Sequence, residues 1–246
     1  MFRKILAVSS FRQFKKPKRR KSKNLTICQG TLAVSDYTLR CLLSVEVCKL
    51  LITVAGFKGG IGKTTTAVHL ACYLSQLGKT LLVDGDPNRS ATGWSKRGEG
   101  DFPFKVVDLM QAALYSPKYE HIVIDTAARP DRDELEALAD GCDLLVLPTT
   151  PDALAVDALL QTVDLLQSLS SDRYRILLTM VHPKPVRMAE QAREALSEVP
   201  LFDTEIRRLI AYEKAALMGV PVYDVKDRKA KIAWNDYEQV GKEILS

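Results

Sequence analysis

The sequence predicts an α/β protein with a mostly parallel sheet and helices on both faces of that sheet. Three observations support this fold class. Short apolar runs alternate with helical windows from residue 50 onward, a glycine-rich turn follows the first run, and two later runs end in aspartates. Strands that alternate with helices imply crossover connections between parallel strands, and the crossover helices then cover the sheet.

The expected strands are short runs rich in Leu, Ile and Val, a composition that suits strands buried on both faces. They cover residues 50–55, 80–84, 121–125, 143–148 and 175–180. The expected helices lie between and after these strands, at about 63–77, 131–140, 152–169, 186–197, 209–218 and 230–245. Gly78 follows the first helix, at a position where helix ends favour glycine.

Length and composition restrict the class of protein. The chain has 246 residues, which is enough for one domain of ordinary size. No run of about 18 or more apolar residues occurs, so no transmembrane helix is expected. The five cysteines show no CxxC spacing. This argues against a disulfide framework or a zinc site and favours a reducing cytoplasm.

Charge is distributed unevenly along the chain. Residues 1–48 carry 11 Lys and Arg against 2 Asp and Glu, whereas residues 49–246 carry 24 basic and 28 acidic residues. The like-charge block at 15–23 contains a proline, which predicts a basic, disordered extension at 1–48 before a folded domain at 49–246. The alternative is an arm that binds nucleic acid. A nucleic-acid contact in the domain itself needs a local basic patch.

A phosphate-binding loop is predicted directly after the first strand. Its residues are Lys58, Gly59, Gly60, Ile61, Gly62, Lys63, Thr64 and Thr65. Glycines let backbone N–H groups turn toward phosphate oxygens, and the following helix adds the positive end of its dipole. We expect Lys63 to reach the β- and γ-phosphates of ATP and the Thr64 hydroxyl to ligate Mg²⁺. Phe57 replaces the usual first glycine of this motif, and Lys58 is an additional lysine.

Aspartates end two of the later strands. Asp84 and Asp86 belong to a DGDP sequence after one strand, and Asp125 ends another. The carboxyl ends of parallel strands meet at one crevice, so these residues are expected beside the phosphate loop. We expect Asp125 to hold Mg²⁺ through water and Asp86 to position the attacking water. Asp84 is a further candidate metal ligand.

The KGGIGKTT and DGDP motifs, with the aspartate that ends the third expected strand, resemble those of the ParA/MinD family of deviant-Walker ATPases. The resemblance runs from about residue 49 to the C-terminus. It implies a P-loop NTPase fold of the deviant-Walker type, hydrolysis of ATP with Mg²⁺, and an ATP-dependent sandwich homodimer. By this resemblance Lys58 reaches the phosphates of the partner subunit, as an arginine finger does elsewhere, and Asp86 is the hydrolytic aspartate.

The stretches at 203–208 and 215–222 also resemble the ParA branch, in its short class without an N-terminal helix-turn-helix domain. This resemblance implies non-specific DNA binding by the dimer, a ParB-like activator, and a cytoplasmic, nucleoid-associated location. No membrane partner is expected, because the C-terminal residues 232–245 do not form a basic amphipathic pattern. The candidate DNA contacts are Arg187, Arg207, Arg208, Arg228, Lys229 and Lys231. Members often read DPQGN where this chain has DPNRS at 86–90, which leaves the cargo open: plasmid, chromosome or another load.

Three other functions are alternatives to a partition ATPase. A MinD-like membrane ATPase needs a basic amphipathic C-terminal helix. Residues 232–245 are mixed in charge and contain Gly241, which favours a packed closing helix. A metabolic ligase of the same fold needs a second catalytic constellation. His69, His121 and His182 are scattered instead, as a core, a strand-start and a loop residue respectively.

The third alternative is an iron–sulfur reductase, which requires a pair of cysteine ligands in each subunit. Cys72 falls in the first expected helix, and Cys142 directly precedes a strand. Neither has an evident partner, so both are expected to be buried and inert.

Overall fold

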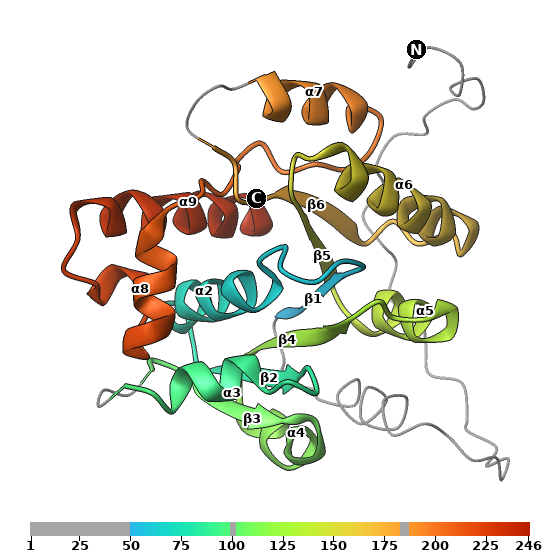
Figure 1. The fold of residues 1–246 in the computed structure, drawn as a ribbon. Coiled ribbons are helices and arrows are strands. Elements are labelled where there is room, and N and C mark those ends of the chain that lie inside the picture. The colour runs from blue at the N-terminus through green and yellow to red at the C-terminus, as the bar shows by residue number, and fades with distance from the viewer. Residues whose placement is uncertain (1–49, 99–101, 183–186) are drawn as a thin grey trace, which may run out of the picture. The chain divides into compact units, whose positions relative to one another are not determined.

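The computed structural model describes residues 50–98, 102–182 and 187–246, so the predicted extension at 1–48 lies outside the described residues. Its centre is a six-stranded sheet in the order β3-β2-β4-β1-β5-β6, with every neighbouring pair parallel (Figure 1). The strands are β1 (Leu50–Gly56), β2 (Thr80–Gly85), β3 (Lys105–Asp108), β4 (His121–Ala128), β5 (Leu144–Thr149) and β6 (Tyr174–Leu178). The predicted α/β class is confirmed.

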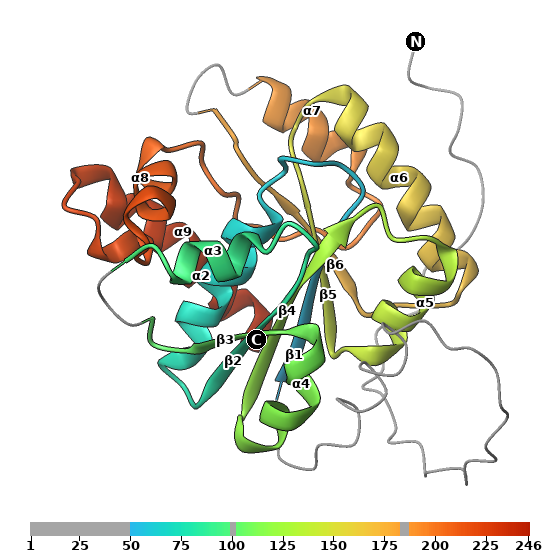
Figure 2. The same cartoon turned by 60° about the horizontal axis from the view of Figure 1, so that its bottom comes forward.

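Helices cover both faces of the sheet. They are α2 (Lys63–Ser75), α3 (Ser90–Ser95), α4 (Leu109–Tyr115), α5 (Arg132–Gly141), α6 (Ala153–Ser168), α7 (Arg187–Ala195), α8 (Ile210–Met218) and α9 (Arg228–Leu245). Two short 3₁₀ turns are η1 (Ser116–Lys118) and η2 (Val222–Asp224). Figures 1 and 2 show the two layers of helices from different directions.

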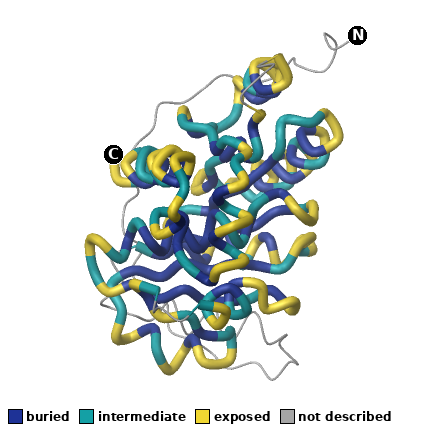
Figure 3. The backbone as a smooth tube through the Cα atoms, turned by 60° about the vertical axis from the view of Figure 1, so that its left-hand side comes forward, coloured by how far each residue is buried: buried dark blue, intermediate teal, exposed yellow. Residues whose placement is uncertain are grey.

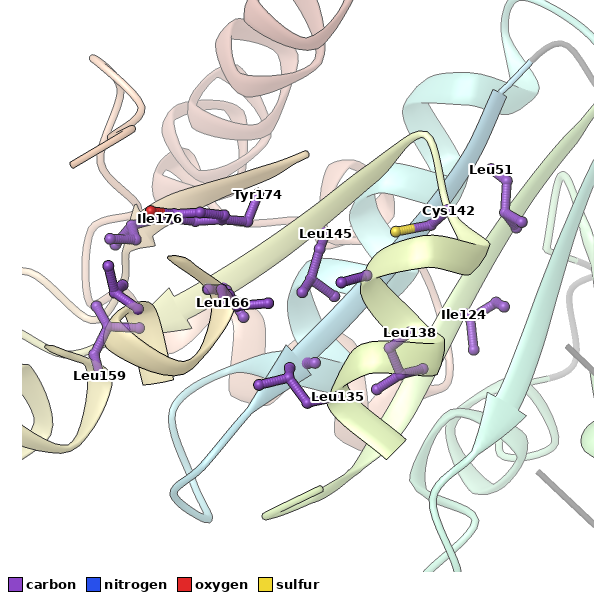
Figure 4. Packing of buried hydrophobic residues seen from close by; sticks show 14 of the residues in the cluster. Leu51, Ile124, Leu135, Leu138, Cys142, Leu145, Leu159, Leu166, Tyr174 and Ile176 are labelled. Atoms are coloured by element: carbon purple, nitrogen blue, oxygen red, sulfur yellow. The ribbon is translucent and has the colours of Figure 1, made fainter. Parts of the chain in front are cut away.

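The core consists of two apolar clusters, because successive side chains of a strand point to opposite faces. In β2, Leu81 and Val83 belong to one cluster and Leu82 belongs to the other. Helices α4 to α7 contribute to the first cluster, part of which Figure 4 shows, and α2, α3, α8 and α9 contribute to the second. Figure 3 shows the buried residues concentrated in the centre of the described chain.

The structure adds elements that the sequence patterns did not indicate. Strand β3 has four residues and a charged residue at each end, so it lacks a long apolar run. Helix α3 has six residues with Gly93 among them, and α4 is a single short helix capped by Asp108. Helix α9 begins two residues before the expected start, because the Asp227 side chain caps it by accepting from Lys229 N at 2.8 Å.

Strand β6 ends at Leu178, two residues before the predicted end. The backbone of the next residue still pairs, since Thr179 N donates to Thr149 O at 2.8 Å. Met180 then adopts a φ of 53° in the left-handed region, which strand geometry does not allow. The chain therefore turns out of the sheet at this point.

The prediction that the C-terminal helix closes the fold is confirmed. Ala230, Ala233, Tyr237 and Val240 are buried on the α2 side of the sheet. At Gly241 a Cβ atom would lie 2.3 Å from Tyr73 Cδ1, so only glycine permits the close packing of α9 on α2. Within the described part of the chain, no helix combines the length and the apolar character that crossing a bilayer requires.

Candidate nucleotide-binding site

The loop between β1 and α2 has the backbone geometry of an anion site. Gly60 and Gly62 take φ values of 75° and 87°, which favour glycine. Gly62 is the N-cap of α2, and it supplies no side-chain oxygen to the first N–H groups of the helix. A Cβ atom at Gly59 or Gly60 would meet nothing within 4 Å. The loop is therefore open on one side, where phosphate oxygens can accept hydrogen bonds from the N–H groups of the loop and of the first turn of α2.

The other loop residues divide into buried and accessible positions. Ile61 is buried and packs its side chain against Gly56, so it can offer only its backbone to a nucleotide. Lys63 is only 7% exposed, and its aliphatic chain also lies against Gly56. Thr64 and Thr65 are half-buried in the first turn of α2. A buried lysine at a helix N-terminus needs an anion nearby, as a bound phosphate provides.

Thr179 fixes the loop to the sheet. Its hydroxyl lies 2.8 Å from the Ile61 carbonyl oxygen and 3.1 Å from that of Thr149. This side chain thus joins the phosphate loop to the ends of β5 and β6. Sequence patterns did not reveal this residue, because a threonine after a strand carries no recognisable signal.

The predicted aspartates lie at the same edge of the sheet. Asp125 is paired with Val54 of β1 on one side and with Asp84 of β2 on the other. Asp125 is fully buried, and no described residue donates a hydrogen bond of normal geometry to either of its carboxylate oxygens. A buried carboxylate without donors is a position where a cation is expected.

Burial raises the pKa of Asp125 to about 7. The Thr64 hydroxyl and the Lys63 ammonium act in the opposite direction, whereas Asp84 and Asp86 raise the pKa further. These four neighbours show that the loop and the carboxylates form one site. Oxygen ligands from Thr64 and Asp125 fit Mg²⁺, which takes much of its coordination from substrate phosphates. Coordination of this kind does not require a full set of protein ligands. The described residues contain no group of three or more His, Cys, Asp or Glu side chains that could hold a metal.

Asp84 has a different role from its neighbour. Its Oδ2 accepts from the backbone N of Thr92 at 2.8 Å and from the Thr92 hydroxyl at 2.6 Å, and its Oδ1 accepts from Asp86 N at 3.3 Å. The carboxylate therefore anchors α3 and the loop that carries Asp86. The structure gives Asp84 a structural role, and its function as a metal ligand remains a prediction.

Asp86 is nearly buried, at 9% exposure, and only one of its oxygens is held. Oδ1 accepts from the backbone N of Asn88 at 2.8 Å and from its side-chain Nδ2 at 2.9 Å. No described residue donates to Oδ2. This arrangement fixes the direction of the carboxylate and leaves one oxygen for a water molecule.

Lys58 lies at the exposed side of the loop. Its Nζ is 3.3 Å from Oδ1 of Asp152, and the two side chains are 46% and 38% exposed. Asp152 is also the N-cap of α6, where it accepts from Ala155 N at 3.0 Å. The sequence carries no signal that marks Asp152 as a partner of Lys58, because an aspartate before a helix is typical of an ordinary N-cap.

The family model of the CobQ/CobB/MinD/ParA nucleotide binding domain matches residues 52–222. The chain belongs to this family. A relative named maintenance of carboxysome distribution protein A, from Gloeobacter kilaueensis, is 36% identical over 200 residues, which cover 78% of this chain and 93% of the relative. Protein ParA of Rhizobium radiobacter is 27% identical over 199 residues, which cover 74% of this chain and 89% of ParA.

Solved structures agree with the fold of a ParA/MinD-type ATPase. A plasmid partition protein from Borrelia burgdorferi bound to AMPPNP has a TM-score of 0.63 at 21% identity, covering 80% of this chain and 98% of that protein. An ATP complex of McdA from Cyanothece has a TM-score of 0.61 at 16% identity, covering 79% and 94%. The predicted ParA-like family is confirmed, and ATP is a nucleotide that proteins of this fold bind.

The structure does not bring the six predicted DNA contacts of this ParA-like chain together. Arg228, Lys229 and Lys231 are exposed at the start of α9. Helix α7, which begins at Arg187, lies apart from α8 and the start of α9 in both views (Figures 1 and 2). The cluster at the start of α9 is therefore the patch on which a DNA contact can be tested.

The two arginines before α8 already have partners. The Arg207 guanidinium pairs with Asp236 of α9, with Nε 3.0 Å from Oδ2. Arg208 Nη1 lies 3.3 Å from His182 Nε2. Arg207 thus joins its segment to α9, and this pairing reduces its availability to phosphate.

The remaining expectations concern histidines and cysteines. His69 is fully buried, His121 begins β4, and His182 is exposed in a loop, as expected. Cys72 and Cys142 are free and buried, and burial raises the pKa of Cys142 to about 12. Thiols of this kind are unreactive, so these two positions do not support a reductase.

Proposed function

We propose that the chain is an ATP-driven positioning switch. ATP binding allows two subunits to form a sandwich dimer, the dimer binds DNA without sequence preference, and a ParB-like partner stimulates hydrolysis and release. The observation that carries this proposal is the buried Asp125 carboxylate, which accepts no hydrogen bond of normal geometry from the described residues and lies next to Thr64 and Lys63 at the start of α2. Family membership and the exposed Lys58 on the same loop add support.

Each residue of the site has a role in this proposal. Lys63 and the N–H groups of the loop bind the phosphates, and Thr64 and Asp125 hold Mg²⁺, which supplies positive charge to the phosphate oxygens. Asp86 orients the attacking water through Oδ2, while Asn88 keeps Oδ1 in place. Lys58 leaves Asp152 and reaches the phosphates of the partner subunit.

The proposed DNA contact is the basic cluster at the start of α9, formed by Lys226, Arg228, Lys229 and Lys231. All four side chains are exposed. Two such clusters on one dimer double the number of cations that meet the DNA, so binding depends on the nucleotide. A cytoplasmic, nucleoid-associated location follows from this contact.

A membrane is not part of this proposal, because the apolar side of α9 is buried against α2 and is not available to lipid. Co-sedimentation with anionic vesicles in the presence of ATP tests this point. Retention of the protein by the vesicles would favour a MinD-like function instead.

The cargo has two candidates. Plasmid or chromosomal DNA is favoured by the likeness to ParA, and a protein microcompartment is favoured by the likeness to the carboxysome distribution proteins. Imaging of the labelled protein in cells that lack or contain each cargo distinguishes them. If oscillations or gradients of the labelled protein persist only in cells that contain one of the two cargoes, that cargo is the one the protein positions.

The switch is tested by calorimetry and light scattering. Wild-type protein is expected to bind ATP and to dimerise with it. Lys63→Ala loses a charge-assisted phosphate contact worth at least about 1.5–3 kcal/mol, so it is expected to do neither. Near wild-type ATP affinity in this variant would remove the phosphate-loop assignment.

A further inference from the structure

Backbone strain in the described chain collects at the carboxyl ends of the strands. Four non-glycine residues have a left-handed φ: Arg89 at 52°, Arg129 at 61°, Ser170 at 56° and Met180 at 53°. Three of them lie within four residues of the ends of β2, β4 and β6, on the side of the nucleotide site. Such a conformation is unfavourable for a residue with a side chain, and strain of this kind collects at functional sites.

Arg129 differs from the other two strained residues near the site. The Arg89 guanidinium donates from Nη1 to the carbonyl oxygen of Asp84 at 3.2 Å, so it is already engaged. Met180 is apolar, and its Cε lies 3.9 Å from the place of a Cβ on Gly62. Arg129 is exposed, and its guanidinium makes no ion pair or hydrogen bond with any residue that the structure describes.

The backbone of Arg129 is fixed beside the phosphate loop. Its N–H donates to the carbonyl oxygen of Gly56 at 3.1 Å, and Gly56 is the last residue of β1 before the loop. Its neighbour Ala128 is in register with Gly56. Arg129 also follows Asp125 by four residues on the same strand end. The backbone of a residue with a long cationic side chain is thus held at the end of β1, directly before the phosphate loop.

We propose that Arg129 is a second catalytic cation of the nucleotide site, and that its guanidinium contacts the terminal phosphates of bound ATP. This inference rests on the proposed function of the loop. A guanidinium presents a planar fork of donors that matches phosphate oxygens, and it stabilises the charge of phosphoryl transfer. A plain turn would favour glycine here, because glycine adopts this backbone without strain.

The variant that tests the proposal is Arg129→Gly, because it removes the guanidinium and relieves the backbone strain together. The expected result is a Tm no lower than that of the wild type, with at least a tenfold loss of ATP hydrolysis. The ratio of the Kd for ADP to the Kd for ATP is expected to fall at least fivefold, since ADP lacks the γ-phosphate that the guanidinium contacts in ATP. Arg129→Lys is expected to retain part of the activity.

Ser170→Gly is the matched control. Ser170 has the same backbone conformation but lies after α6, away from the strand ends that form the site. This variant is expected to match or exceed the wild-type Tm and to leave hydrolysis and both nucleotide affinities unchanged. Comparison of Arg129→Gly with Ser170→Gly distinguishes the effect of relieving backbone strain from the effect of removing the cation.

A mixing experiment shows whether the phosphate belongs to the same subunit or to the partner. Arg129→Gly and Asp86→Ala are each expected to be inactive alone. If Arg129 acts across the dimer, a mixture regains hydrolysis, because one site then has its own Asp86 and receives Arg129 from the partner. If Arg129 acts within its own subunit, the mixture stays inactive.

Two results would overturn the proposal. Hydrolysis by Arg129→Gly within twofold of the wild type would show that the arginine touches no reacting group, and a lower Tm would show that it acts through folding. A failure of the proposed function looks different. In that case the wild type and Ser170→Gly would themselves fail to hydrolyse ATP, or Lys63→Ala would bind ATP normally.

Discussion

The ammonium of Lys58 lies 3.3 Å from the carboxylate of Asp152, so the lysine expected to act across the dimer is paired within its own subunit. Both side chains are more than a third exposed, and a pair of this kind contributes at most about 1 kcal/mol. ATP binding and dimerisation can therefore break it at small cost. Asp152 holds Lys58 in place without locking it.

The first prediction follows from this pair. Asp152→Asn keeps an N-cap for α6 but removes the negative charge that holds Lys58. Thermal stability is expected to change little, and light scattering is expected to show dimerisation at a lower ATP concentration. Asp131→Asn is the matched control, because Asp131 caps α5 in the same way. An unchanged ATP requirement in Asp152→Asn would mean that the pair does not restrain Lys58.

The second prediction separates the roles of Asp86 and Lys58. Asp86→Ala keeps the phosphate loop and loses the carboxylate that orients water, so it is expected to bind ATP and to accumulate as a dimer. Lys58→Ala is expected to bind ATP but to lose stimulated turnover, dimerisation, or both. Light scattering with ATP distinguishes them. If both variants behaved alike as inactive monomers, this division of roles would be wrong.

The third prediction concerns Thr179. Thr179→Val keeps the shape of the side chain and removes the hydroxyl that donates toward the Ile61 carbonyl. A loss of about 1 kcal/mol in stability and a weaker affinity for ATP are expected, because the loop loses its anchor on the sheet. The control is Thr162→Val, where the buried hydroxyl bonds only within α6, to Ala158 O at 3.1 Å. Equal ATP affinities in the two variants would contradict the anchoring role.

The fourth prediction is a pH dependence that arises from His69. Burial lowers its pKa from 6.5 to about 4, against the raising effect of the Thr65 carbonyl. Nδ1 of the neutral ring lies 2.7 Å from the Thr65 carbonyl oxygen, and Nε2 accepts a hydrogen bond from Val222 N at 3.2 Å. The ring also stacks on Tyr237. The unfolded chain takes up the proton first as pH falls. His69 therefore contributes its full stability above pH 6.5, and this contribution is lost between pH 6.5 and 4.

Urea unfolding at pH 7.5 and 4.5 measures this effect. The contribution of His69 is expected to be on the order of 3 kcal/mol, and it is absent in His69→Gln. The variant is thus less stable at pH 7.5 but loses less stability on acidification. The exposed His182→Gln serves as control, and the other titrating groups are common to all three proteins. Parallel acid losses in wild type and His69→Gln would contradict the assignment.

Much of the nucleotide site could be predicted from the sequence, because its chemistry depends on residues adjacent in the chain. The glycines, Lys63 and Thr64 form one motif, and aspartates that end parallel strands meet at one edge. Asp152, Thr179 and Arg129 could not be found in this way. They reach the loop from other strand ends, and an aspartate cap, a lone threonine and an arginine carry no pattern that marks such contacts.

The fold likewise has parts that the sequence predicts and parts that it does not. Long apolar strands were predicted within one or two residues of their start, whereas β3 was missed because it has only four residues and charged ends. The six DNA candidates share only their positive charge in the sequence. Sequence could not show that the Arg207 guanidinium is paired with Asp236, 29 residues later, or that Arg187 lies on a separate helix.

DNA binding in each nucleotide state tests the proposed switch most directly. The full chain and residues 49–246 are compared with ATP, with ADP and without nucleotide over a range of salt. Because the domain has more acidic than basic residues, binding must depend on the α9 cluster and on the dimer. The ATP state is expected to bind with a slope of about −0.9 per phosphate neutralised, and charge reversal at Arg228, Lys229 and Lys231 is expected to flatten it. Equal binding in all nucleotide states, or binding that disappears when residues 1–48 are removed, would contradict the account.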